Sequence, residues 1–258
     1  MSLTIALAII LGCTLLSGMA GALVHRRVRV DVRRRHQEVG TTIFLQLGVI
    51  FAVLLAFVFS EVWSDYNAAA SSIELECSAL EDAGVLASAL PPAQAYAVLK
   101  AEQVYVDGVI YEEWPLMFSS RSEDVSVDDM LHSAIVTTAR LHPADAADLG
   151  LRQEILSYLE QAHTQRTIRT FQLGSGVPIF LWALLISFGV VLAVFVSMAG
   201  VESGRALVSF SATFAAAVAA ILVLIHLLDF PFEGALSLPP GHFLHTLHEI
   251  TELAQSVR

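Results

Sequence analysis

Charged residues are scarce in this chain. Only 15% of its 258 residues are Asp, Glu, Lys or Arg, against about 25% in an ordinary soluble domain. Lysine occurs once, at Lys100, and the formal net charge is −11. An acidic balance of this kind lacks the basic surface that nucleic-acid binding requires, so we expect no nucleic-acid partner.

Cysteine and the common catalytic motifs are also missing or rare. The two cysteines are Cys13, inside an apolar run, and Cys77, in a polar region, so neither a mutual disulfide nor a metal-binding spacing is expected. The chain has no nucleophile elbow, phosphate loop, zinc-protease helix or dinucleotide fingerprint. We therefore expect no enzyme and no cofactor.

Long apolar runs account for the missing charge. The clearest occupies residues 41–63, with no formal charge between Thr41 and Ser60. At about 1.5 Å per residue this run spans the roughly 30 Å core of a bilayer as a helix. Further apolar runs occupy residues 2–24, 177–198 and 206–228. The sequence therefore predicts four transmembrane helices.

The first apolar run is predicted to be a retained membrane helix. A signal peptide would place basic residues before its apolar part, whereas here they follow it. The small residues Gly18, Ala20, Gly21 and Ala22 either form a face for close helix packing or are simply tolerated, and the sequence leaves both readings open.

A basic loop at residues 25–40 separates the first two runs. Its six arginines are Arg26, Arg27, Arg29, Arg33, Arg34 and Arg35. Arginines in a short loop between two spans predict a cytoplasmic loop, which places the N-terminus and the large polar region outside. Contact with anionic lipid headgroups is the second role we expect of these residues, with membrane lipid as the partner.

The polar region between the second and third runs is acidic and is predicted to be helical. Residues 61–176 contain 18 acidic and 6 basic side chains. Apolar spacing predicts helices over 68–90, 93–118, 126–141 and 144–171, with a break near Trp114 and Pro115. The predicted parts of the chain are residues 1–63, the domain at 64–176, residues 177–229, and a tail at 230–258.

Two groups of histidines could carry chemistry. His242, His245, His248, Glu249 and Glu252 have a spacing that could hold a divalent ion on a helix, but a solvated amphipathic tail is the reading we favour. We accordingly predict no metal. His226 and Asp229 form either a titratable pair at a membrane edge or, as we favour, an interface histidine bonded to backbone.

Two charged motifs in the polar region have both a structural and a functional interpretation. Glu112 and Glu113 precede Trp114 and Pro115, a pattern that favours a helix corner capped by a carboxylate over a cation site. Arg166 and Arg169 share a helical face. They could attract anions, but pairing with acidic residues of the same region is favoured.

Several of these segments together resemble the bacterial bestrophin-like family. The matching pieces are VGTTIFLQLGVIFAVLLAFVFSEVWSDY, VIYEEWP, an R-x-x-R pair followed by GVPIFLW, and LLDFPFEG. This family is distantly similar to bestrophins, which are pentameric anion channels. The resemblance implies an all-α bestrophin-like fold, with four transmembrane helices and a helical extramembrane domain inserted between helices 2 and 3. It also implies a homo-oligomer, by resemblance a pentamer, in the bacterial inner membrane.

The resemblance assigns roles to particular residues. Aligned on Trp63 and Tyr66, it places Leu45, Val49 and Val53 at the apolar neck of a pore; the alternative is that they face lipid or another helix. Calcium gating is not expected, because the run of aspartates that follows the fourth helix in bestrophins is absent. The resemblance gives structural roles to the residues that match the family's motifs, here Trp63, Tyr66, Glu113, Trp114, Pro115, Pro231, Phe232 and Gly234.

The resemblance and the residues disagree on two points. In bestrophins the large soluble region is cytosolic, whereas the arginine loop predicts that it is outside. The resemblance implies anions as the permeant small inorganic ions, whereas the acidic balance leaves cations open. We predict a homo-oligomeric ion channel whose pore is lined by the second helix; the alternative is a non-conducting scaffold or sensor whose soluble domain binds a partner.

Overall fold

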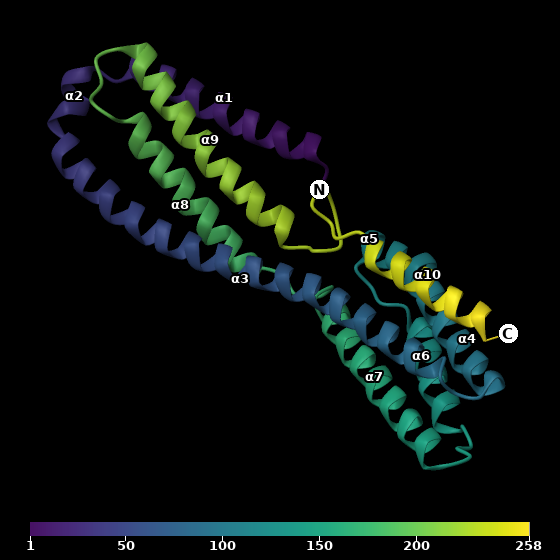
Figure 1. Cartoon of the computed structure of the whole chain (residues 1–258). Helices are drawn as coiled ribbons and strands as arrows, with labels where there is room; N and C mark the ends of the chain where they lie inside the picture. Colours follow the sequence, from purple (N-terminus) through teal and green to yellow (C-terminus); the bar gives the residue numbers. More distant parts are fainter. Residues whose placement is uncertain (258) are drawn as a thin grey trace. The chain divides into compact units, whose positions relative to one another are not determined.

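The computed structural model describes residues 1–257, and within that range it contains helices and no strand. The predicted all-α fold with four apolar helices is confirmed. The chain divides into two compact units. The first consists of Met1–Ser64 and Gly176–Asp229, and the second of Asp65–Ser175 and Phe230–Arg258. Figure 1 labels the helices of both units.

The first unit is a bundle of long apolar helices. It contains α1 (Leu3–Arg27), the short α2 (Val30–Arg35), the first part of α3 (Gln37–Ala87), α8 (Ile179–Ser197) and α9 (Gly204–Leu228). Helices α1, α3, α8 and α9 are each long and apolar enough to cross a bilayer. Most of their side chains face outward, as expected where lipid replaces a protein core as the apolar surroundings.

Small residues let α1 and α9 approach closely. Gly18 and Gly21 are buried in this contact, and a Cβ added at Gly21 would lie only 3.0 Å from the Ser211 Oγ. The Ser17 hydroxyl donates a 2.9 Å hydrogen bond to the Ser211 carbonyl. The packing reading is therefore confirmed for both glycines, whereas Ala20 is exposed. Close contact of this kind is typical of helix association in membranes.

Helix α3 is longer than the sequence predicts. We expected a membrane helix ending near Trp63 and a separate helix over 68–90, but a single helix runs for 51 residues from Gln37 to Ala87. No proline interrupts it, and Pro91 and Pro92 follow its end, so no residue within it forces a break. In the first unit, Phe51 stacks on Phe188 of α8 with ring centroids 6.5 Å apart.

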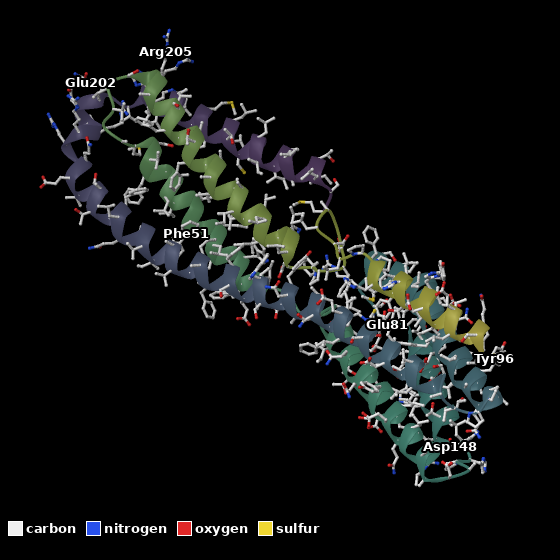
Figure 2. The ribbon with its side chains drawn as sticks, viewed as in Figure 1. Phe51, Glu81, Tyr96, Asp148, Glu202 and Arg205 are labelled. Carbon is white, nitrogen blue, oxygen red and sulfur yellow. The ribbon has the colours of Figure 1, made fainter. Side chains whose placement is uncertain are left out.

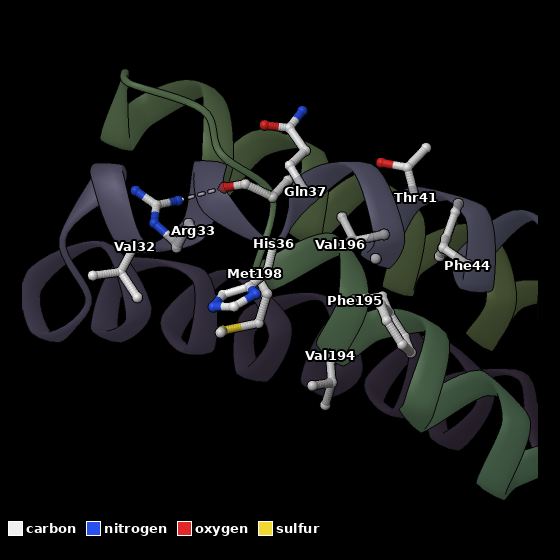
Figure 3. A pocket seen from close by; sticks show the side chains of 12 residues that line it. Val32, Arg33, His36, Gln37, Thr41, Phe44, Val194, Phe195, Val196 and Met198 are labelled. Carbon is white, nitrogen blue, oxygen red and sulfur yellow. Dashed lines mark hydrogen bonds between the residues drawn. The ribbon is translucent and has the colours of Figure 1, made fainter.

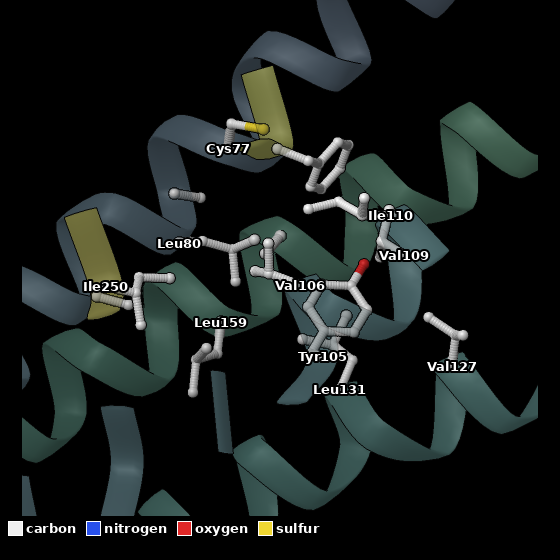
Figure 4. Packing of buried hydrophobic residues seen from close by; sticks show 14 of the residues in the cluster. Cys77, Leu80, Tyr105, Val106, Val109, Ile110, Val127, Leu131, Leu159 and Ile250 are labelled. Atoms are coloured by element: carbon white, nitrogen blue, oxygen red, sulfur yellow. The ribbon is translucent and has the colours of Figure 1, made fainter. Parts of the chain in front are cut away.

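The second unit is a helical bundle with its own apolar core. It contains the rest of α3 together with α4 (Pro92–Gly108), α5 (Trp114–Ser120), α6 (Val125–Ala139), α7 (Ala146–Phe171) and α10 (Gly241–Ser256). Figure 4 shows buried side chains of these helices packing together, among them Leu80, Tyr105, Leu131, Leu159 and Ile250. The amphipathic tail helix α10 buries one face here rather than lying free in solvent.

A π-helical turn replaces the break that we predicted near Trp114. Residues Val109–Glu113 form this turn, η1, between α4 and α5. The Trp114 N–H donates to the carbonyl of Val109, five residues back. Pro115 has no N–H to donate and its ring crowds the preceding turn, so the wider turn lets the helix continue past it. The break in the helix that we expected at this point is therefore wrong.

Aspartates fix the starts of α6 and α7. The Asp124 carboxylate accepts from the Ser126 N–H, which caps α6, and its hydrogen bonds with Ser126 hold the pKa of Asp124 below its ordinary value. The Asp145 carboxylate accepts from the N–H groups of Ala147 and Asp148 at the start of α7. Each cap satisfies backbone donors that have no partner within the helix.

Candidate functional site

The predicted neck residues lie along one exposed stripe of α3. Leu45, Val49 and Val53 are 60%, 64% and 66% exposed, and their spacing of four residues keeps them on one helical face. Phe51 and Val58, on the opposite side, are buried in the first unit. Figure 2 labels Phe51 on the side of α3 that faces α8. A pore-lining stripe and a lipid-facing stripe would both look like this in a single chain, so the pore assignment stays a prediction.

Trp63 and Tyr66, which end the apolar part of α3, have different environments. Trp63 is about half-exposed and stacks on Phe59 at 6.4 Å between ring centroids. The Tyr66 hydroxyl donates a 3.0 Å hydrogen bond to the Leu236 carbonyl, in the turn that follows α9. Tyr66 thus fastens that turn to α3 within the second unit.

Two of the six arginines in the basic loop bind the α8–α9 connection. Arg33 is buried and donates to the carbonyls of Ala199, at 2.5 Å, and Val201, at 3.2 Å. Arg34 donates to the Gly200 carbonyl and pairs with Glu202 at 2.6 Å. Figure 3 shows Arg33 at the rim of a pocket that is otherwise mostly apolar. Arg33 therefore packs against the α8–α9 connection, a role that the charge of the basic loop does not predict.

A buried charge network occupies the core of the second unit. The Arg169 guanidinium is fully buried and donates from Nε to the Glu76 Oε2 at 2.8 Å and from Nη2 to the Glu113 Oε2 at 3.0 Å. Its Nη1 lies 3.1 Å from the Met117 Sδ. Burial by itself would lower the pKa of Arg169, but the charges of Glu76 and Glu113 outweigh that effect and raise it. The arginine is therefore held in its charged form.

Arg166 extends this network toward the surface. It donates to the Glu113 Oε1 at 2.5 Å and to the Asp128 Oδ1 at 2.8 Å, so Glu113 bridges the two arginines. The prediction that Arg166 and Arg169 pair with acidic residues of their own region is confirmed. Glu113 is not a simple helix cap, as we expected: it binds both arginines and also accepts from the Asp124 N–H at 3.3 Å.

Tyr105 completes the charge network from α4. Its hydroxyl is fully buried and donates to the Glu76 Oε1. Burial, reinforced by the negative charge of Glu76, raises the pKa of Tyr105 well above its ordinary value, so the phenol keeps its proton. Every Glu76 oxygen thus has a partner, as a buried carboxylate requires.

Aromatic rings and the turn after α9 enclose the network. The Arg169 Cζ lies 5.6 Å from the ring centroid of Trp114 and 5.3 Å from that of Phe243. Trp114 also meets Phe232 edge-on at 5.7 Å. Gly234 lies within the turn and has a φ of 89°. Of the residues that the resemblance marks as structural, Trp114 therefore lies beside the buried Arg169 and Phe232 packs on Trp114, an arrangement that sequence spacing did not reveal.

Glu102 is a buried carboxyl outside the network. It is fully buried on α4, and neither of its oxygens has a hydrogen-bond partner among residues 1–257. Burial raises its pKa well above the ordinary value. A neutral side chain is the state that such surroundings favour.

The histidine groups named from the sequence lie apart from this network. His242, His245 and His248 are on the exposed face of α10, where His248 pairs only with Glu252, at 3.2 Å, among the ion pairs found in the described residues. The Asp229 carboxylate accepts from the Val177 N–H at 2.9 Å. His226 packs edge-on against Trp182.

A different histidine cluster, on α6 and α7, was not predicted from the sequence. Asp128 and His132 lie one turn apart on α6, and His163 of α7 lies beside them. In the described part of the chain this is the one group of three His, Cys, Asp or Glu side chains close enough to share a metal ion. The Asp-x-x-x-His spacing was a readable signal, but only the packing of α6 on α7 brings in the third residue.

Together these features define an integral membrane protein of four apolar helices, with a second helical unit built around buried arginines. A sequence model of the bestrophin-like domain matches residues 11–243. The chain therefore belongs to the bestrophin-like family.

Solved structures agree with this assignment. The chain is similar to a bacterial bestrophin homologue from Klebsiella pneumoniae, with a TM-score of 0.71 at 14% identity, over 95% of this chain and 98% of that one. A crystal structure of a single-residue variant of the same homologue gives a TM-score of 0.73 at 14% identity, with the same coverage. At this identity the likeness establishes the fold. No curated protein matches the chain.

Proposed function

We propose that the protein is a homo-oligomeric channel that passes small ions through a pore lined by α3. The observation that carries the proposal is the exposed stripe of Leu45, Val49 and Val53, opposite the buried face of the same helix. A ring of such side chains around an axis would form an apolar constriction, which can gate by losing its water. One chain supplies only one side of that ring, so conduction requires several copies. Family membership supports a pentamer.

The distribution of charge favours small cations over anions. Residues 61–176 have an acidic excess that every copy in the assembly repeats. Arg166 and Arg169, the two cations that we considered for attracting anions, are buried in ion pairs and cannot face water. A field of this sign raises the local concentration of cations.

We place the channel in the bacterial cytoplasmic membrane, with the arginine loop in the cytoplasm. Arg26, Arg27, Arg29 and Arg35 are exposed, and Arg29 lies 3.4 Å from Asp31. Exposed arginines of this loop can favour a cytoplasmic orientation and contact anionic headgroups. Reporter fusions within Ser119–Asp129 should then respond as periplasmic. A cytoplasmic response would reverse the orientation without affecting the pore assignment.

Ion flux through the full chain in liposomes tests the channel. We expect cation flux, and a larger flux for Leu45→Ala and Val49→Ala because each shortens an apolar side chain of the constriction. Val190→Ala on α8 is the matched control, since Val190 is also exposed and apolar. If intact oligomers carry no current in any ionic condition, the channel proposal fails and the scaffold or sensor reading replaces it.

Cysteine labelling tests the pore lining separately from conduction. In a background where Cys13 and Cys77 are replaced by serine, Val49→Cys should react with a charged, membrane-impermeant thiol reagent from the aqueous phase. Val190→Cys should not react, because we expect lipid around it. Equal protection of both positions, in assemblies shown to be conducting, would contradict an aqueous pore at Val49.

A further inference from the structure

A pair of histidines and an aspartate meet on one side of α6 and α7. His132 Nδ1 lies 3.4 Å from the Asp128 Oδ2, and His163 Nε2 lies 3.8 Å from the Asp128 Oδ1. The two imidazole rings meet at 71° with centroids 5.0 Å apart. One donor atom from each of the three residues falls within 4.8 Å of the others.

The helices themselves bring these donors together. Asp128 and His132 are four residues apart and therefore lie on one face of α6. His163 is three residues before Arg166 on α7, and Arg166 binds the Asp128 Oδ1 at 2.8 Å. This ion pair joins α7 to α6 through the Asp128 Oδ1, whereas the Asp128 Oδ2 lies on the side of His132.

We propose that Asp128, His132 and His163 bind a divalent metal ion such as Zn²⁺. Two imidazole nitrogens and a carboxylate oxygen are ligands that zinc accepts, with a fourth position left for water. Tetrahedral zinc with bonds of about 2.0–2.2 Å places its ligand atoms roughly 3.3–3.5 Å apart. The donor atoms now lie within 4.8 Å of one another, and the side chains of Asp128, His132 and His163 are partly buried or exposed, so these atoms must move closer when the ion binds.

The surroundings of the cluster suit a cation. Arg166 holds Asp128 as an outer partner of the kind that orients metal ligands. The charge of Arg166 is itself taken up by Glu113, 2.5 Å away, and Glu123 lies 4.0 Å from its Nη1. A bound ion would thus connect, through Asp128 and Arg166, to the buried network of Glu113 and Arg169. The assignment stands independently of the proposed channel.

Metal titration of the purified full chain tests the site. The protein is prepared in detergent without a polyhistidine tag, stripped with a chelator, and titrated with Zn²⁺ by calorimetry and with Co²⁺ by visible absorption. We expect one high-affinity ion per chain and tetrahedral cobalt bands. Loss of one imidazole in His132→Ala or His163→Ala should weaken binding about tenfold or more, which is the effect of losing roughly 1.4 kcal/mol or more of binding free energy.

His248→Ala is the matched control. His248 also has a carboxylate one turn away, Glu252 at 3.2 Å, but it lacks a third ligand. This variant should bind Zn²⁺ as the parent does. Circular dichroism and gel filtration confirm that each variant is folded and assembled. The proposal is overturned if the parent binds no Zn²⁺, or if His132→Ala and His163→Ala bind it as tightly as His248→Ala does.

Discussion

Arg169 on α7 donates two hydrogen bonds to one carboxylate, that of Glu76 on α3. Its Nε lies 2.8 Å from the Glu76 Oε2, and its Nη2 lies 3.2 Å from the Glu76 Oε1. Both side chains are fully buried. The fork of a guanidinium matches the two oxygens of a carboxylate, which fixes the geometry of the pair as well as its charge. The pair therefore sets the register of two helices that are far apart in the sequence.

Removing this guanidinium should destabilise the second unit strongly. Arg169→Leu leaves Glu76 buried without its cation and leaves Glu113 with Arg166 alone, and breaking a buried pair in this way costs about 3–5 kcal/mol. Denaturant unfolding in detergent measures the loss. Arg140→Leu is the control: Arg140 is exposed, and surface changes of that kind stay within roughly 0.5 kcal/mol. Equal stability of the two variants would refute a structural role for the network. Arg169→Lys should recover only part of the loss, since a lysine cannot form the fork.

Glu102 should make stability depend on pH. Because burial raises its pKa above the ordinary value of 4.5, the folded chain keeps a proton that the unfolded chain releases. Stability is then lost as the pH rises above that ordinary value, by up to about 1.4 kcal/mol per pH unit. Glu102→Met removes the titrating group. The free energy of unfolding of this variant, relative to that of the parent, should therefore increase between pH 5 and pH 8.

Unfolding of both proteins across that pH range measures this difference. Glu112→Met is the control, because Glu112 is an exposed glutamate in the π-helical turn that follows α4. A constant difference between Glu102→Met and the parent would show that Glu102 does not titrate between the folded and unfolded states.

The left-handed backbone of Gly234 should make that position intolerant of side chains. At a φ of 89° a Cβ meets steric strain, so Gly234→Ala should cost about 1–3 kcal/mol. Gly174→Ala has open space around its Cβ and no positive φ, and it should cost far less. Thermal unfolding compares the two. A harmless Gly234→Ala would mean that the turn after α9 adapts without cost.

Substitutions of Arg33 and Arg35 should distinguish a role in packing from a role in membrane orientation. Arg33→Gln removes donors to the carbonyls of Ala199 and Val201, and hydrogen bonds from charged groups contribute about 1.5–3 kcal/mol. Arg35→Gln changes the loop charge equally at an exposed position and should leave stability unchanged. Unfolding measurements give the change in stability of each variant, and a reporter fusion gives its membrane orientation. If the variants lose stability equally, Arg33 has no special packing role.

The candidate site could be predicted only in part. Arg166 and Arg169 were paired correctly with acidic residues, because a region so rich in carboxylates offers few other partners to its arginines. Their partners Glu76 and Glu113 could not be named, since they lie 93 and 56 positions from Arg169 along the chain. The π-helical turn at Pro115 was mistaken for a break, because a proline disrupts regular helical hydrogen bonding in both cases.

The sequence by itself determined the four apolar helices and the all-α class, because uninterrupted runs of apolar residues satisfy their backbone only as helices in lipid. Tertiary structure alone decided that Arg33 is buried and that His163 meets Asp128 and His132. Those outcomes depend on which side chains of distant segments come into contact. Periodicity along one segment identifies a helical face, but not the residue from another helix that packs against it.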